Sequence, residues 1–317
     1  MLYLYRYDDA WRARWAPRDF LVVFSDTGDE HPETYAHIER TRAWCAKENI
    51  AFETITKDRG YHAPSWRDLI THYREYETVQ VHGFSGACTQ QLKIAPIYKF
   101  LDDWIGQTYG YPSGQKRAIH AFGREHGKIR VLLGMAAKET KRVPYEKRKP
   151  EHQTLALTRG RAKKPLTPQE RAARNNPSLW GYWIDQCFPL YEEDIDRAGA
   201  QAIIKRYGCE VPPPSNCMRC HYQSPIELVW LWRFHPDKFH EWEQLEEAKI
   251  QRDAAGRPDR EGGLRVIPLA EFHGVYGHKR LRERLNEALA QHGHMTDAEL
   301  HEYKMSHGHC TMTNWGG

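Results

Sequence analysis

The sequence has no long hydrophobic run. No apolar stretch in its 317 residues approaches the roughly 18–20 residues of a membrane-spanning helix. Charged residues also interrupt the N-terminal MLYLYRYDDAWR too early for a secretion signal. We therefore expect a cytoplasmic protein without a membrane partner.

Net charge and cysteine are also scarce. The 46 Lys and Arg residues exceed the 42 Asp and Glu residues by only four, an excess too small by itself to indicate nucleic-acid binding. Seven cysteines without a secretion signal indicate reduced thiols or metal ligands rather than disulfides. The chain shows no internal repeats, and a hydrophobic content of 40% fits a globular protein of one or two domains.

Residues 20–35 (FLVVFSDTGDEHPETY) are the most informative stretch. Leu21–Phe24 is a continuous apolar run, which is typical of a strand covered on both faces. Turn-forming residues follow it, and Pro32 lies where a helix begins. In open α/β sheets ligands bind at the carboxyl ends of the strands. Four turn residues occupy that position here: Ser25, Asp26, Thr27 and Gly28.

Four segments together resemble the phosphoadenosine-phosphosulfate reductase-like family of the adenine nucleotide alpha hydrolases, or PP-loop ATP pyrophosphatases. Phe24–Thr34 (FSDTGDEHPET) resembles the family's DTG…PET segment, and Cys88–Pro96 (CTQQLKIAP) its Cys-x-x-x-x-Lys-x-x-Pro element. Gly134–Arg142 (GMAAKETKR) resembles its Gly-x-x-x-x-Glu-x-x-Arg turn, and Val211–Cys220 (VPPPSNCMRC) its Cys-x-x-Cys element. The resemblance implies an α/β fold: an open, mostly parallel, Rossmann-like twisted sheet with helices on both faces, plus a helical, Cys-bearing C-terminal part.

The chain departs from the family in two places. The Ser-Gly-Gly-x-Asp/Thr-Ser phosphate loop is not found, and Met1–Tyr7 is similar to the helix that would follow it. Either the loop is lost, or the start lies downstream of the true one, or MLYLY itself serves as the missing strand. Val79–Phe84 is predicted to be a short strand, and the glycine turn after it could imitate a phosphate loop. Ala136 and Lys138 replace an Arg and an Asp of the family, so catalysis is less secure than binding.

The resemblance also assigns roles to single residues. The turn at residues 25–28 would hold the adenosine portion of ATP or another adenine nucleotide, and Gly134 would permit close backbone approach. Lys93 and Arg142 would contact the phosphates, because a point charge and a guanidinium fork suit polyphosphate oxygens. Glu139 would hold Mg²⁺ or orient Arg142.

The cysteines suggest a metal site. Cys217 and Cys220 place two thiolates on one tight turn, a geometry that soft metals favour. The family supplies a third ligand at Cys88, but Ala87 stands where cluster-bearing relatives have an adjacent cysteine, and Cys209 is the natural replacement. Four thiolates would hold Zn²⁺ or a [4Fe–4S] cluster, and the broken cluster pattern favours zinc. Buried reduced cysteines are the structural alternative.

We expect three parts along the chain. An adenine nucleotide alpha hydrolase-like α/β domain spans residues 1–210 and carries a basic insertion or loop at 138–175. A Cys-x-x-Cys and helical subdomain follows at 211–252, and a linker with a small C-terminal helical tail spans 253–317. The basic segment 138–174 is either a solvated surface loop or a cationic lid over a polyphosphate or a nucleic-acid strand. Several tail residues could form an adventitious metal site, although a polar tail is favoured: His292, His294, His307, His309 and Cys310.

These features favour an adenine-nucleotide-binding, ATP pyrophosphatase-like protein that cleaves ATP or ADP towards AMP with Mg²⁺. Relatives in this branch accompany phage, CRISPR and DNA-modification loci, so the resemblance implies an accessory role beside nucleic acid or a ribonucleoprotein. One alternative is a non-catalytic nucleotide- or nucleic-acid-binding scaffold. The other is a sulfonucleotide reductase, which is disfavoured because the Glu-Cys-Gly-Leu/Ile-His motif of those enzymes is absent.

Overall fold

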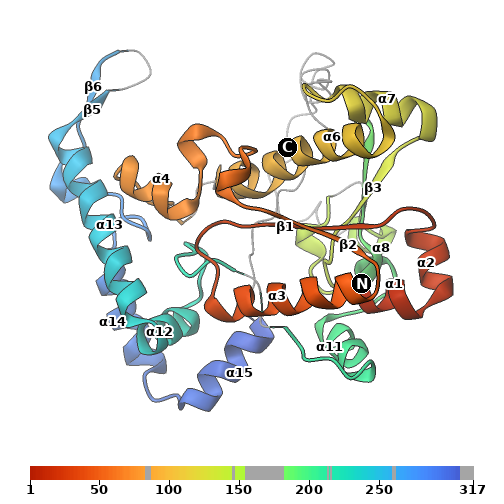
Figure 1. The fold of residues 1–317 in the computed structure, drawn as a ribbon. Helices are drawn as coiled ribbons and strands as arrows, with labels where there is room; N and C mark the ends of the chain where they lie inside the picture. The colour runs from red at the N-terminus through yellow and green to blue at the C-terminus, as the bar shows by residue number, and fades with distance from the viewer. Residues whose placement is uncertain are drawn as a thin grey trace.

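The computed structural model describes residues 1–82, 87–144, 147–153, 182–212, 214, 216–258 and 262–307. Within these ranges the protein is a mixed α/β structure with many helices, two parallel strand pairs and one short antiparallel pair, and no closed barrel (Figure 1). No helix of the described part combines the length and apolar character needed to cross a membrane.

The predicted βα unit is confirmed. β1 (Leu21–Ser25) pairs in parallel with β2 (Ala51–Ile55), and α3 (Pro32–Lys47) connects them. Pro32 is the first residue of α3, where its missing N–H costs no hydrogen bond. In Figure 1, α3 and α6 (Ala95–Tyr109) lie on opposite sides of this pair, and both contact β2.

A second parallel pair is formed by β3 (Ile129–Leu132) and β4 (Ile184–Cys187). No ladder joins it to β1 and β2 within the described ranges. The largely apolar run at residues 183–190 is typical of one strand, but β4 ends at Cys187. The chain turns there because Pro189 begins the short helix α10 (Pro189–Glu192).

Helices cover both faces of the second pair. Val131 packs in a cluster with residues of α6, whereas the next residue, Leu132, packs with residues of α1 (Leu2–Tyr7) and α2 (Asp9–Trp15). Successive side chains of a strand point to opposite faces, so this alternation places α6 on one face and the N-terminal helices on the other. The same α6 also contacts β1 and β2.

Two expectations for strands are wrong. The hypothesis that MLYLY serves as a strand fails because Leu2–Tyr7 is helical, and Tyr5 stacks on Phe20. The described part of the segment 79–84, residues 79–82, forms no strand, and the His82 N–H pairs with the Val275 carbonyl. Residues 83–86 lie outside the described residues.

The C-terminal helices share one hydrophobic core. α12 (Pro225–Phe234), α13 (Pro236–Ala255), α14 (Leu281–His292) and α15 (Asp297–His307) pack around it, and Tyr73 and Leu92 from the first third of the chain complete it (Figure 1). The residues that we assigned to a tail therefore pack with the helices that follow the Cys-x-x-Cys segment. The remaining α-helices and strands of the described part are α4 (Leu69–Glu75), α5 (Ala87–Thr89), α7 (Arg117–His126), α8 (Pro150–Gln153), α11 (Arg197–Arg206), β5 (Arg257–Pro258) and β6 (Leu264–Arg265).

Candidate functional site

The turn after β1 is held in one conformation. The Asp26 carboxylate accepts hydrogen bonds from the Gly28 N–H and the Tyr35 hydroxyl, each at 2.8 Å. Gly28 has a φ of 75°, which favours glycine, and a Cβ there would lie 2.6 Å from the Cβ of Asp68. Glycine is therefore required at this position, and the predicted nucleotide turn is rigid.

This turn meets the CTQQLKIAP segment. The Ser25 hydroxyl donates to the Leu92 carbonyl at 2.6 Å. In the next residue of that segment, the Lys93 ammonium lies 3.6 Å from the Glu30 carboxylate, whose side chain is fully buried. Two of the four motif segments are thus in direct contact, and Lys93 lies beside the predicted nucleotide turn.

The same turn also meets the Cys-x-x-Cys segment. The Thr27 hydroxyl lies 3.3 Å from the Cys217 sulfur, and Glu30 forms an isolated β-bridge with Cys217. Asp29 forms a buried ion pair with Arg219 and also accepts the Arg219 backbone N–H at 2.9 Å. Three of the four motif segments therefore come together at the carboxyl end of β1.

The Gly134–Arg142 segment places its two functional candidates side by side. One Glu139 oxygen accepts from the Arg142 guanidinium at 2.7 Å, and the other accepts the Ala136 N–H at 2.9 Å. Arg197 lies 3.8 Å from the same carboxylate. Of the two roles predicted for Glu139, the geometry supports the orientation of Arg142. Gly134 lies at the end of β3, where an added Cβ would approach the Met1 side chain to 3.2 Å.

The four predicted cysteine ligands are not gathered. No described cysteine forms a disulfide, and burial raises the pKa of the Cys217 thiol well above its ordinary value. Cys88 packs against the same core cluster as Cys217, but the Cys209 thiol donates to the Tyr207 carbonyl. No three of the sulfurs of Cys88, Cys209, Cys217 and Cys220 lie within 4.8 Å of one another. The described residues therefore show no gathered thiolate group, and the thiolate site stays a prediction.

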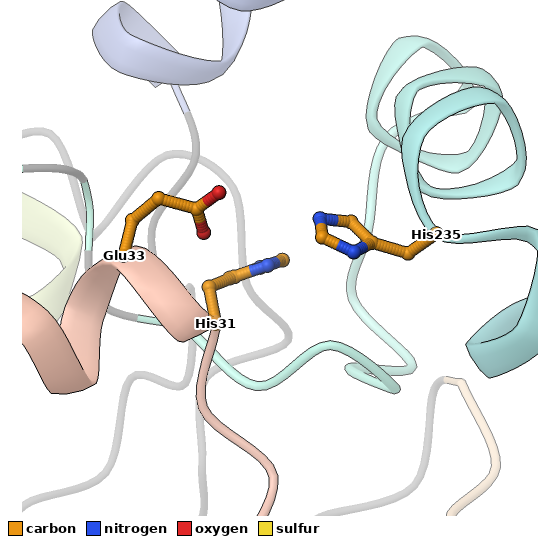
Figure 2. A group of neighbouring side chains, drawn as sticks. All are labelled: His31, Glu33 and His235. Atoms are coloured by element: carbon orange, nitrogen blue, oxygen red, sulfur yellow. The ribbon is translucent and has the colours of Figure 1, made fainter.

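A different set of potential ligands is gathered. The side chains of His31, Glu33 and His235 place their ligand atoms within 4.8 Å of one another, the only such set of three among the described residues (Figure 2). Burial, with smaller contributions from Lys304 and then His235, lowers the pKa of His31 to about 3. The imidazole is therefore neutral near pH 7.

The sequence analysis did not identify this cluster, although the sequence contains a signal for it. Each histidine directly precedes a proline that begins a helix, His31 before α3 and His235 before α13. Such a pair of His-Pro steps places two imidazoles at helix N-termini, but only the fold shows that the two termini meet.

A buried lysine lies close to this cluster. The Lys304 ammonium donates to the Asn216 side chain at 3.0 Å and to the Glu227 carboxylate at 3.3 Å. It also lies 5.2 Å from the centre of the Trp230 ring. Burial lowers the pKa of Lys304, and Glu227 opposes this change. Buried ionisable side chains with shifted pKa values occur often at functional sites. The network around Lys304 therefore supports a functional role for the neighbouring cluster of His31, Glu33 and His235.

Two surface hollows lie elsewhere and contain none of the predicted site residues. One, of about 300 Å³, is lined by residues of 79–81 and 249–273, and the other, of about 330 Å³, by residues of 59–61 and 99–115. Both are open hollows, and neither by itself indicates a small-molecule site.

The described part of the basic segment is largely paired. Lys138 pairs with Asp196 at 2.6 Å, Lys147 pairs with Asp185 at 2.7 Å, and Lys149 pairs with Asp194. Residues 154–181, which carry the remaining cations of the segment, lie outside the described residues, as do His309 and Cys310.

Comparisons with protein-family models, with curated proteins and with solved structures each found no match.

Proposed function

We propose that the chain binds an adenine nucleotide and cleaves ATP or ADP towards AMP, as an ATP pyrophosphatase-like protein. The observation that carries this proposal is the contact of three motif segments at the carboxyl end of β1. Ser25 and Thr27 reach the segments of Lys93 and Cys217, respectively. In α/β folds, ligands bind at this end of the strands, where backbone amides and loop side chains converge.

The proposal includes one open, mostly parallel, Rossmann-like sheet. β1 and β2 are parallel, β3 and β4 are parallel, and α6 packs on both pairs. A single helix that covers both pairs supports their membership in one twisted layer with helices on each face.

The proposed chemistry uses Lys93 beside the turn and Arg142 in the fourth motif segment. Lys93 lies 3.6 Å from Glu30 and its side chain is partly exposed, a position from which its ammonium could contact a phosphate oxygen. Glu139 holds the Arg142 guanidinium in place. A fixed guanidinium can stabilise charge that develops on phosphate oxygens during transfer. Bound Mg²⁺ would neutralise further phosphate charge.

A non-catalytic scaffold is the second candidate. Lys93 and Arg142 each face a carboxylate, which lowers the positive charge available to a triphosphate. In either case, a role beside nucleic acid or a ribonucleoprotein through the basic segment 138–174 belongs to the proposal.

Chromatography of ATP and ADP after incubation with the full chain and Mg²⁺ tests the proposal. We expect AMP from the wild type, and at least about a hundredfold less AMP from Arg142→Ala and Lys93→Gln. Lys99→Ala is the matched control, because this exposed lysine donates only to the Tyr61 carbonyl.

The outcomes separate the two candidates. AMP formation that is unchanged in Arg142→Ala and Lys93→Gln would refute the assigned roles. A folded wild type that forms no AMP but is thermally stabilised by ATP would favour the scaffold. If the folded wild type forms no AMP and is not stabilised by ATP, both ATP cleavage and a nucleotide-binding scaffold are excluded.

A further inference from the structure

Three side chains from two distant parts of the chain point towards one point near the start of α3 (Figure 2). His31 immediately precedes α3, Glu33 lies in its first turn, and His235 joins α12 to α13. Their ligand atoms all lie within 4.8 Å of one another. Two imidazoles and one carboxylate form a common ligand set for divalent transition metals.

The burial of His31 is the second, independent observation. Its side chain is turned into the cluster, and the residue is only 2% exposed. Neither ring nitrogen makes a well-formed hydrogen bond, although Asn216 lies close enough for a weak interaction. Buried polar atoms in native proteins nearly always have a partner. A metal ion bound to the imidazole would supply the missing partner.

An aromatic side chain holds the two imidazoles in position. The Trp230 ring lies edge-on to the His31 ring at 5.1 Å between centroids and packs against the His235 ring at 5.0 Å. The indole N–H donates to His301 at 3.2 Å, which fixes the orientation of Trp230 itself. Such packing around metal ligands limits their rotamers and favours binding.

We propose that His31, Glu33 and His235 bind one divalent first-row transition-metal ion, for which Zn²⁺ is the probe. Imidazole ligands favour zinc over Mg²⁺ and Ca²⁺, which prefer all-oxygen sites. Glu33 is exposed and His235 is partly exposed, so the ion keeps a side open to solvent. Three protein ligands and one open position are typical of catalytic rather than structural zinc sites. This site is distinct from the predicted thiolates and goes beyond the nucleotide function.

Two nearby positive charges disfavour a bound cation, and the effect of each is reduced by its surroundings. The positive N-terminal ends of α3 and α13 lie at the cluster, but this effect is weak near solvent. Lys304 lies near His31, and Glu227 offsets its charge. Tetrahedral zinc bonds of about 2.0–2.2 Å place ligand atoms roughly 3.4 Å apart. Small rotations of the exposed Glu33 and the partly exposed His235 side chains can bring the three ligand atoms to this spacing from within 4.8 Å.

Competition between the untagged, metal-stripped full chain and a chromogenic chelator for added Zn²⁺ tests the proposal. We expect one Zn²⁺ per chain, with the affinity lowered about a hundredfold or more in Glu33→Gln and in His235→Gln. Glu39→Gln on α3 and His240→Gln on α13 are matched controls at exposed positions and should bind like the wild type. The test avoids substitution of His31, which would also disturb packing.

Co²⁺ distinguishes this site from the cysteines. Because the proposed ligands contain no sulfur, the Co²⁺ spectrum should lack a sulfur-to-metal charge-transfer band, and Cys217→Ser should not change the affinity. Wild-type affinity in both Glu33→Gln and His235→Gln, no stoichiometric Zn²⁺ binding, or a charge-transfer band would each overturn the proposal. Because these readouts need no nucleotide, they fail or succeed independently of the proposed ATP cleavage.

Discussion

Removal of one partner from the buried ion pair between Asp29 and Arg219 should lower stability strongly. Both side chains are at most 3% exposed, and a second guanidinium nitrogen of Arg219 pairs with Glu241. Asp29→Asn keeps the shape of the side chain but removes its charge, which leaves a buried guanidinium with one carboxylate. Removal of one partner of a buried pair costs about 3–5 kcal/mol. Because Glu241 stays, we expect a loss of about 3 kcal/mol in the free energy of unfolding.

Urea unfolding followed by tryptophan fluorescence measures this loss, provided that the slope of the transition stays unchanged. Burial raises the pKa of Asp29 and Arg219 lowers it, so the comparison belongs at about pH 8, where the carboxylate is ionised. The exposed pair of Glu39 and Arg42 supplies the control, and Glu39→Gln should cost less than about 1 kcal/mol. A loss below about 1 kcal/mol for Asp29→Asn would refute the reasoning.

Two further predictions concern a buried histidine and a helical glycine. Burial, and then the charge of His82, lowers the pKa of His221 from 6.5 to about 4. The folded protein then binds fewer protons than the unfolded chain, so the free energy of unfolding should fall by up to roughly 3 kcal/mol as the pH drops from about 6.5 to 4. Urea unfolding across this range measures the slope, and an unchanged slope in His221→Gln would contradict the assignment. A Cβ at Gly123 would lie 2.4 Å from the Trp183 ring. Gly123→Ala should therefore lower the melting temperature and reduce the free energy of unfolding by about 1–3 kcal/mol, despite the better helix propensity of alanine. A melting temperature at or above that of the wild type would contradict this prediction.

Local elements were predictable because neighbouring residues determine them. The apolar run of β1 and the proline that begins α3 predict strand and helix correctly. Ser224 and Glu227 have the spacing of a capping box, and both of its hydrogen bonds are present at the start of α12. In each case the signal lies within four residues, so no tertiary contact is needed to interpret it.

Features that depend on tertiary contacts were not predictable in the same way. Cys209 was chosen as a fourth ligand from its spacing, but its thiol donates to the Tyr207 carbonyl two residues away. The cluster of His31 and His235 was missed because more than 200 positions separate the two residues. Hydrophobic periodicity carries no information on which helix termini meet, since that depends on how the core of α12–α15 packs against the first third of the chain.

The long-range contacts of the candidate site determine when it can form in the cell. Asp29 and Arg219 are 190 positions apart, and ribosomes add about 5–20 residues per second. Synthesis of Arg219 therefore follows that of Asp29 by roughly 10–40 s. In that interval β1 and β2 can already pair and α3 can pack against them, because these contacts are local. The turn is made early in translation but is completed only when residue 219 of 317 has been added, and its polar groups stay hydrated until residues 216–220 arrive.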